Sequence, residues 1–67
     1  MNNHCPLSRR QLQILELVAR GHSDQEVADR LMVSVHTVKG HLSLSYARLR
    51  VRNRMEAISL ARKEGWL

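Results

Sequence analysis

Aromatic residues are scarce in this sequence of 67 residues, which contains one Trp, one Tyr and no Phe. Any hydrophobic core must therefore be built from Leu, Val, Ile and Ala. Hydrophobic residues make up 43% of the chain, which is enough for one compact core. A chain this short forms one small domain that buries only a modest fraction of its surface.

A single cysteine, Cys5, excludes an intramolecular disulfide and fits a reducing compartment. The sequence has no charged segment followed by a short apolar one, which a signal peptide requires. It also has no apolar run of the length that spans a bilayer. We therefore expect a soluble, cytoplasmic protein with no membrane partner.

Acidic residues are also few, because 6 Asp and Glu stand against 11 Lys and Arg and give a formal net charge of +5. This balance predicts an anionic partner. Charge alone leaves nucleic acid, anionic lipid and an acidic protein open, and it leaves open a basic domain that is merely soluble. The stretch between Val33 and Met55 contains no Asp or Glu at all.

Start and stop signals predict four helices and no strand, so the expected fold class is all-α. Each predicted helix follows a residue whose side chain can cap it. These caps are Ser8, Ser23, Ser34 and Asn53. Gln or Glu stands at the third helical position after three of them, as in a capping box. Residues 1–7 are predicted to form a flexible N-terminal arm, and residues 8–67 one domain.

The apolar residues of each predicted helix recur on one side, which is expected to face a shared core. The expected core residues are Ile14, Leu15, Leu17, Val18, Val27, Ala28, Leu31, Val38, Leu42, Leu49, Ala57, Ile58 and Ala61. Trp66 and Leu67 are expected to fold back as an apolar lid, and Leu12 is either a rim residue or a partner contact. Met32 stands in the turn before the third helix, where Gly is often found and a left-handed backbone would carry a cost.

The predicted third helix, residues 35–50, has two sides of different chemistry. At about 100° per residue, one side is apolar except for Ser45. The opposite side is small and basic, and it carries His36, Lys39, Gly40, Ser43, Ala47 and Arg50. A helix that lies in a major groove needs an apolar back and a slim, positive front. Base contacts are therefore expected from His36, Lys39, Gly40 and Ser43.

Four arginines stand at the end of this helix and just after it. They are Arg48, Arg50, Arg52 and Arg54, and we expect about half of them to contact phosphates, since a charge run is usually a solvated face.

Several segments carry a resemblance to a known family. They are L-S-x-R at Leu7–Arg10, I-L-x-L-V-A-R-G at Ile14–Gly21, S-D-Q-E-V-A-D-R-L at Ser23–Leu31, S-V-H-T-V-K-G-H-L-S at Ser34–Ser43 and R-L-R-V-R-N-R at Arg48–Arg54. In this order and spacing, and followed by Ala57, they resemble the LuxR/GerE-type DNA-binding domain of bacterial transcription factors. The resemblance runs from Leu7 to about Leu67.

This resemblance implies a four-helix domain in which the second and third helices form a helix-turn-helix. The third helix would enter the major groove. The family's groove-facing and phosphate-facing positions fall on Thr37, Lys39, Gly40, His41 and Ser43. Of these, Thr37 and His41 come mostly from the resemblance, and a local hydrogen bond is an equally good reading of Thr37.

The resemblance also implies that the fourth helix forms a homodimer contact. Leu60 is expected to point away from the core, with Glu56 and Lys63 on the same side, which suits a small self-complementary contact. The chain departs from the family pattern in a few places. Gln11 and Gln13 replace the usual Glu, Met32 and Arg50 the usual Gly, and Ser45 a usual large aliphatic residue.

The predicted function is a sequence-specific transcriptional regulator that binds double-stranded DNA as a homodimer, in the cytoplasm and associated with the nucleoid. The alternative is a stand-alone helix-turn-helix module that binds another regulator or RNA polymerase. The bare front at Gly40 and Ala47 keeps this alternative open, whereas the basic front argues against it. A steep salt dependence of DNA affinity would separate the two.

Other functions are not expected. The sequence shows no nucleophile with a positioned base, no phosphate-cradling Gly-rich loop and no paired carboxylates, so we expect no enzyme. His36 and His41 are five residues apart and point in different directions, and His4, Cys5 and His22 lack the spacing of a metal site. We expect no cofactor, no metal and no small-molecule site.

Overall fold

The computed structural model describes residues 4–67, which form four helices and, within that range, no strand. The helices are α1 (Arg9–Ala19), α2 (Asp24–Leu31), α3 (Val35–Leu49) and α4 (Arg54–Lys63). The expected all-α fold is confirmed. Residues 1–3, which belong to the predicted arm, lie outside the described residues.

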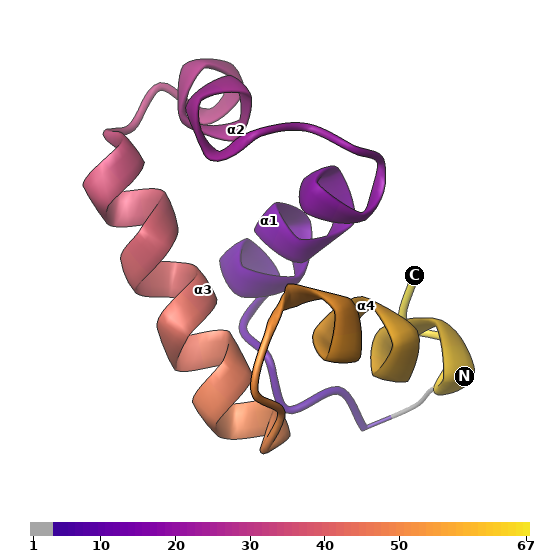
Figure 1. Cartoon of the computed structure of the whole chain (residues 1–67). Helices are drawn as coiled ribbons and strands as arrows, with labels where there is room; N and C mark the ends of the chain where they lie inside the picture. Colours follow the sequence, from indigo (N-terminus) through magenta and orange to yellow (C-terminus); the bar gives the residue numbers. More distant parts are fainter. Residues whose placement is uncertain (1–3) are drawn as a thin grey trace.

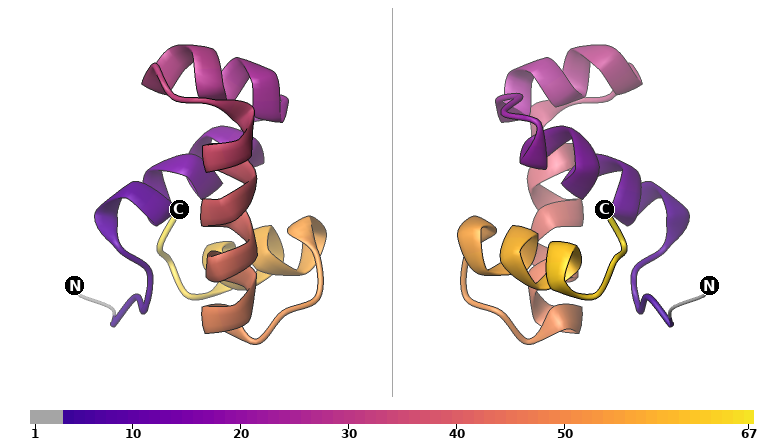
Figure 2. Two further views of the ribbon diagram at one scale, coloured as in Figure 1. Left: turned by 90° about the vertical axis from the view of Figure 1, so that its left-hand side faces the viewer. Right: turned by 90° about the vertical axis from the view of Figure 1, so that its right-hand side faces the viewer.

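Helix α3 is the longest element and forms one edge of the domain (Figure 1). It contacts each of the three other helices. The view onto α3 in Figure 2 shows α2 near its beginning, α1 and α4 crossing behind it, and its outer side in front. The other helices therefore hold α3 from one side only.

The predicted capping residues begin all four helices. The Ser8 and Ser23 hydroxyls accept the N–H groups of Gln11 and Glu26, both at 3.1 Å, and both capping boxes are complete. Ser34 and Asn53 cap α3 and α4. Each cap satisfies a backbone N–H that the helix itself leaves without a partner.

The core consists of two clusters. The first joins α1, α2 and α3 through Ile14, Val18, Val27, Ala28, Val38 and Leu42. The second joins α1, the end of α3 and α4 through Leu7, Leu15, Leu49, Ala57 and Ala61. The core pattern is confirmed, although three of the expected residues are only partly buried. These three are Leu17, Leu31 and Ile58.

The sequence pattern did not predict the burial of Leu7. We placed it in a flexible arm, yet its side chain is 8% exposed and belongs to the second cluster. Arg48 also donates from Nη1 to the Pro6 carbonyl at 3.2 Å, which ties this segment to α3. Burial of a leucine against α1 and α4 explains why residues just before the Ser8 cap pack on the domain.

Ser45 lies on the buried side of α3 and is fully buried. Its hydroxyl donates to the His41 carbonyl one turn earlier at 2.7 Å. This bond within the helix satisfies a polar group that would otherwise cost free energy in the core. A serine can therefore occupy a position where the surrounding residues are aliphatic.

Two helices end on non-glycine residues with a left-handed backbone. Met32 ends α2 with φ 59°, and Arg50 ends α3 with φ 58°. Arg50 therefore lies just beyond α3 and not inside it, which corrects the predicted end of the third helix by one residue. The Met32 side chain is 91% exposed, so its packing does not offset the cost of this conformation.

The strained turn at Met32 leads to a first prediction. Met32→Gly should raise the free energy of unfolding by about 0.5–1 kcal/mol, because glycine adopts the left-handed backbone without the clash of a Cβ. Urea denaturation followed by circular dichroism measures the change.

Met55 provides a matched control, because it is also exposed but lies inside α4. Met55→Gly should lower the stability, since glycine is a poor helix former. If both variants lose stability, the conformation of Met32 carries no appreciable cost.

Candidate nucleic-acid interface

The outer side of α3 brings most of the predicted contact residues together on one exposed surface. The exposed members are His36, Thr37, Lys39, Gly40 and Ser43. No other described helix covers this side in the left view of Figure 2. Because α3 contains no acidic residue, the surface is free of negative side chains from its own helix.

The beginning of α3 is organised by a pair of hydroxyl groups. Ser34 Oγ accepts the Thr37 N–H at 3.0 Å and donates to Thr37 Oγ1 at 3.0 Å. Thr37 thus accepts from Ser34, and its own hydroxyl hydrogen stays available to an outside acceptor. A phosphate oxygen near this helix start would also meet the positive end of the helix dipole.

His41 is only partly buried, but its Nδ1 atom is buried without a hydrogen-bond partner among residues 4–67. A buried nitrogen without a partner costs free energy whether it carries a hydrogen or a lone pair. His41 thus lies between the buried side of α3 and its exposed side.

The four arginines differ in what their side chains already contact. Arg48 donates to Pro6, and Arg54 forms an ion pair with Asp24. Arg50 and Arg52 are exposed, and their guanidinium groups form no hydrogen bond to any residue in the range 4–67. The structure therefore leaves Arg50 and Arg52 as the more available cations.

Arg54 links the beginning of α4 to the beginning of α2. Its Nη2 lies 2.7 Å from Asp24 Oδ1 at the beginning of α2, and it also bonds to Tyr46 on α3. Partial burial of Arg54 works to lower its pKa, but the hydrogen bonds to Tyr46 and Asp24 outweigh it and raise the pKa. The guanidinium thus remains charged and connects α4 to α2 through the ion pair with Asp24.

Asp24 and Tyr46 lie beside the predicted contact residues, and sequence reasoning missed both. They line a hollow of about 250 Å³. The other residues that line it are Lys39, Leu42, Ser43 and Arg54. Asp24 and Arg54 are 30 residues apart, so no local spacing could have paired them. The hollow places one acidic side chain beside the basic surface.

On α4, the predicted dimer residues are not equally accessible. Glu56 and Lys63 are exposed, and Leu60 is partly buried and packs against the second cluster. Our expectation that Leu60 points away from the core is therefore wrong in part. The Glu56 carboxylate also accepts the Arg52 N–H at 2.8 Å, which orders the loop before α4.

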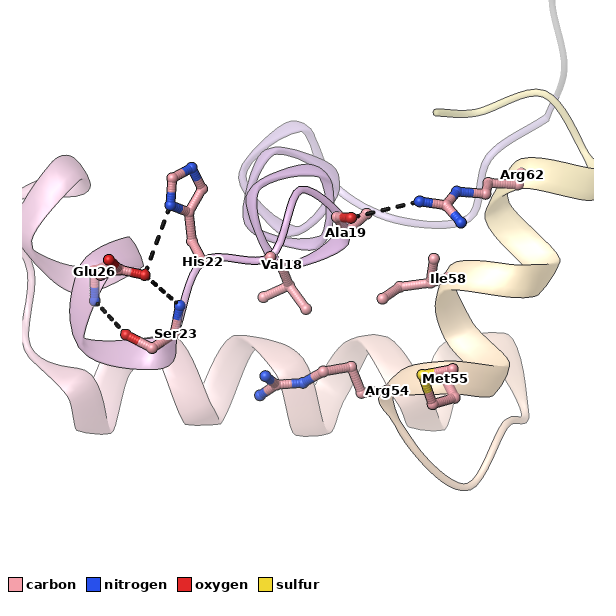
Figure 3. Close-up of a pocket in the computed structure, with 10 residues that line it drawn as sticks. Val18, Ala19, His22, Ser23, Glu26, Arg54, Met55, Ile58 and Arg62 are labelled. Carbon is pink, nitrogen blue, oxygen red and sulfur yellow. Dashed lines mark hydrogen bonds and ion pairs between the residues drawn. The ribbon is translucent and has the colours of Figure 1, made fainter.

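A second hollow, of about 450 Å³, lies between the end of α1, the beginning of α2 and α4 (Figure 3). Val18 and Ile58 give it apolar walls. Its charged groups are engaged, because Arg62 donates to the Ala19 carbonyl at 3.4 Å and Glu26 accepts the Ser23 N–H at 2.8 Å. That backbone hydrogen bond is the main cause of the lowered pKa of Glu26.

Within residues 4–67, no three side chains of His, Cys, Asp or Glu come together as a metal-binding group. No helix in that range combines the length and the apolar character that crossing a membrane requires.

The connection from α2 to α3, residues 32–34, joins two helices of which the second presents an exposed basic side. This is the arrangement of a helix-turn-helix domain. The profile described as "GerE: Bacterial regulatory proteins, luxR family" matches residues 5–61. The chain belongs to this family, which confirms the resemblance.

Curated relatives agree with this assignment. "Transcriptional regulatory protein DesR" of Bacillus subtilis (strain 168) is 39% identical over 61 residues, which are 91% of this chain and 31% of that relative. "Oxygen regulatory protein NreC" of Staphylococcus carnosus (strain TM300) is 38% identical over 58 residues, 87% of this chain and 27% of that relative. The chain thus spans less than a third of the length of these regulators.

A solved structure gives the same result for the fold. The structure titled "Crystal Structure of Response Regulator ChrA in Heme-Sensing Two Component System" matches with a TM-score of 0.86 and 39% identity. The match covers 91% of this chain and 30% of the other. These relatives are named as regulators and not as enzymes.

The link between Asp24 and Arg54 leads to a second prediction. In a double-mutant cycle of Asp24→Asn and Arg54→Gln, we expect a coupling of about 1 kcal/mol in the free energy of unfolding, since the pair is partly exposed. Urea denaturation of the four proteins measures it. Additive effects of the two substitutions would show that this ion pair does not stabilise the fold.

Proposed function

We propose that this domain binds double-stranded DNA with α3 in the major groove and thereby regulates transcription. The observation that carries the proposal is the exposed side of α3, which is basic, slim and free of acidic residues. A DNA-reading helix has this chemistry because phosphates require cations and a narrow helix can approach the base edges. Family membership supports the same function.

The proposed contacts fall into two groups. One group donates hydrogen bonds to phosphates and sets the position of the domain on the duplex. It consists of Thr37, His41, Arg50 and Arg52. Lys39, His36 and Ser43 reach toward base edges, and Gly40 lets the helix backbone come close. Arg54 contributes indirectly, because its guanidinium is engaged with Asp24 and Tyr46.

The domain is proposed to act as a homodimer in the cytoplasm, associated with the nucleoid. A two-fold axis next to α4 would bring Glu56 of one copy near Lys63 of the other, with Leu60 between them. Two recognition helices would then lie about one helical turn apart on a pseudo-palindromic site. RNA polymerase is a further partner that a regulator of transcription would contact.

A third prediction tests the DNA contact at Lys39. Selection from a random DNA pool should enrich a site, and Lys39→Ala should weaken binding to it about 5- to 50-fold. The slope of log affinity against log salt should fall by at most about 1, because the substitution also removes one positive charge from beside the phosphates. Fluorescence anisotropy at several salt concentrations measures both quantities.

Arg20→Ala is the matched control, because it also removes one exposed positive charge. Arg20 follows α1, whose last turn lies on the side away from α3 (Figure 1). Its substitution should leave the affinity within about twofold. If the wild-type domain does not bind DNA at moderate salt, the proposal fails, and the alternative of a protein-interaction module becomes the one to test.

A fourth prediction concerns the homodimer. On DNA with two half-sites, Lys63→Glu should reduce cooperative binding about 3- to 10-fold, because two glutamates would then face each other across the axis. The double substitution Lys63→Glu with Glu56→Lys should restore part of it. Gel-shift titrations on DNA with one and with two half-sites give the cooperativity.

Arg30→Glu makes the same charge change on α2 and should leave the cooperativity unchanged. Because the Glu56 side chain also accepts the Arg52 N–H, thermal denaturation must show that the double variant is folded. Full cooperativity in the Lys63→Glu protein would place the dimer contact elsewhere.

A further inference from the structure

Leu44 is a large apolar side chain on α3 that belongs to neither core cluster and is 59% exposed. The other exposed large apolar residues among those described lie outside this helix. They are Met32, Met55 and Leu67. A single exposed leucine is ordinary on a protein surface, so its meaning depends on where it stands.

Leu44 stands at the edge of the proposed DNA-reading surface. At about 100° per residue, it lies within roughly 40° of Gly40 and on the opposite side of α3 from the buried Leu42. Helical side chains lean toward the beginning of the helix, so Leu44 leans toward the turn that contains Gly40 without covering it.

Gly40 leaves that turn open. A Cβ at Gly40 would meet no described atom within 4 Å, so nothing fills the space over its backbone. The Leu44 side chain is therefore presented on an open surface. The exposed Thr37 lies on its side nearer the beginning of α3, and the exposed Ala47 lies on its side nearer the end. Leu44 is the large apolar side chain on this surface, and the other long side chains there are polar or basic.

We propose that Leu44 is a specificity-determining residue that contacts the C5-methyl group of a thymine in the major groove. This inference rests on the proposed function, because it requires α3 to lie in that groove. The thymine methyl is the apolar group that base pairs display there, and apolar side chains recognise it. The positive charge of the surrounding surface fits DNA as the partner and disfavours an apolar protein partner.

The proposed contact has a specific chemical consequence. Cytosine lacks the methyl group and places an amino group on the same edge, so it is disfavoured beside Leu44. Uracil differs from thymine only by the missing methyl group. It therefore isolates the apolar contact from every hydrogen bond at that base pair.

The experiment first selects a DNA site for the wild-type domain and then replaces each thymine of that site by deoxyuridine, one at a time. For the thymine beside Leu44, this replacement should weaken wild-type binding about fourfold, the value for one buried methyl group. In the Leu44→Ala protein the same replacement should have no effect on affinity. This protein should bind the unmodified thymine site at least about fourfold more weakly than the wild-type domain does.

Met55→Ala is the matched control, since it shortens another exposed apolar side chain. This protein should keep the full loss of affinity on replacing thymine by deoxyuridine. Leu44→Met should keep most of it, because methionine is also large and apolar. Leu44 is exposed, so its variants should fold normally, which thermal denaturation checks.

The failures are distinguishable. If the wild-type domain enriches a site but no deoxyuridine weakens binding, or if the loss persists unchanged in Leu44→Ala, the inference is overturned and the proposed function stands. If the domain enriches no DNA site, both are overturned.

Discussion

The burial of one side of α3 is the constraint on which the rest of the structure depends. Val38 and Leu42 hold the first half of the helix against α1 and α2, and Leu49 holds its end against α1 and α4. Because one rigid helix joins both clusters, the position of its outer side is set relative to α4 as well as to α2. A site on α3 and a contact on α4 would therefore be held at a constant spacing.

Three of the six acidic residues stabilise the fold, and none of the three lies on α3. Asp24 pairs with Arg54, Glu26 caps α2, and Glu56 accepts the Arg52 N–H. Each carboxylate thus stabilises a helix start or a loop where backbone N–H groups or a cation already favour it. The lowered pKa of Glu26 shows this effect, because its backbone hydrogen bond favours the charged form.

Local signals predicted most of this fold, and contacts between distant segments account for what was missed. The caps at Ser8 and Ser23 and the apolar period of α3 depend on neighbours within one or two turns, which a sequence displays directly. The contact of Arg54 with Asp24 depends on how α4 crosses the domain. The burial of Leu7 depends on the same packing, and helical periodicity says nothing of a residue before the first helix.

The difference between local signals and contacts of distant segments also applies to the proposed interface. Periodicity selected the exposed side of α3 but placed Arg50 inside the helix, and the run of four arginines made Arg54 a candidate phosphate contact. The structure engages Arg54 internally and turns the chain at Arg50. The net charge of +5 therefore overstates the number of cations that α3 and its neighbours can offer to phosphates. With few cations available, the affinity of such a surface depends more on the fit of its short side chains to the groove than on charge alone.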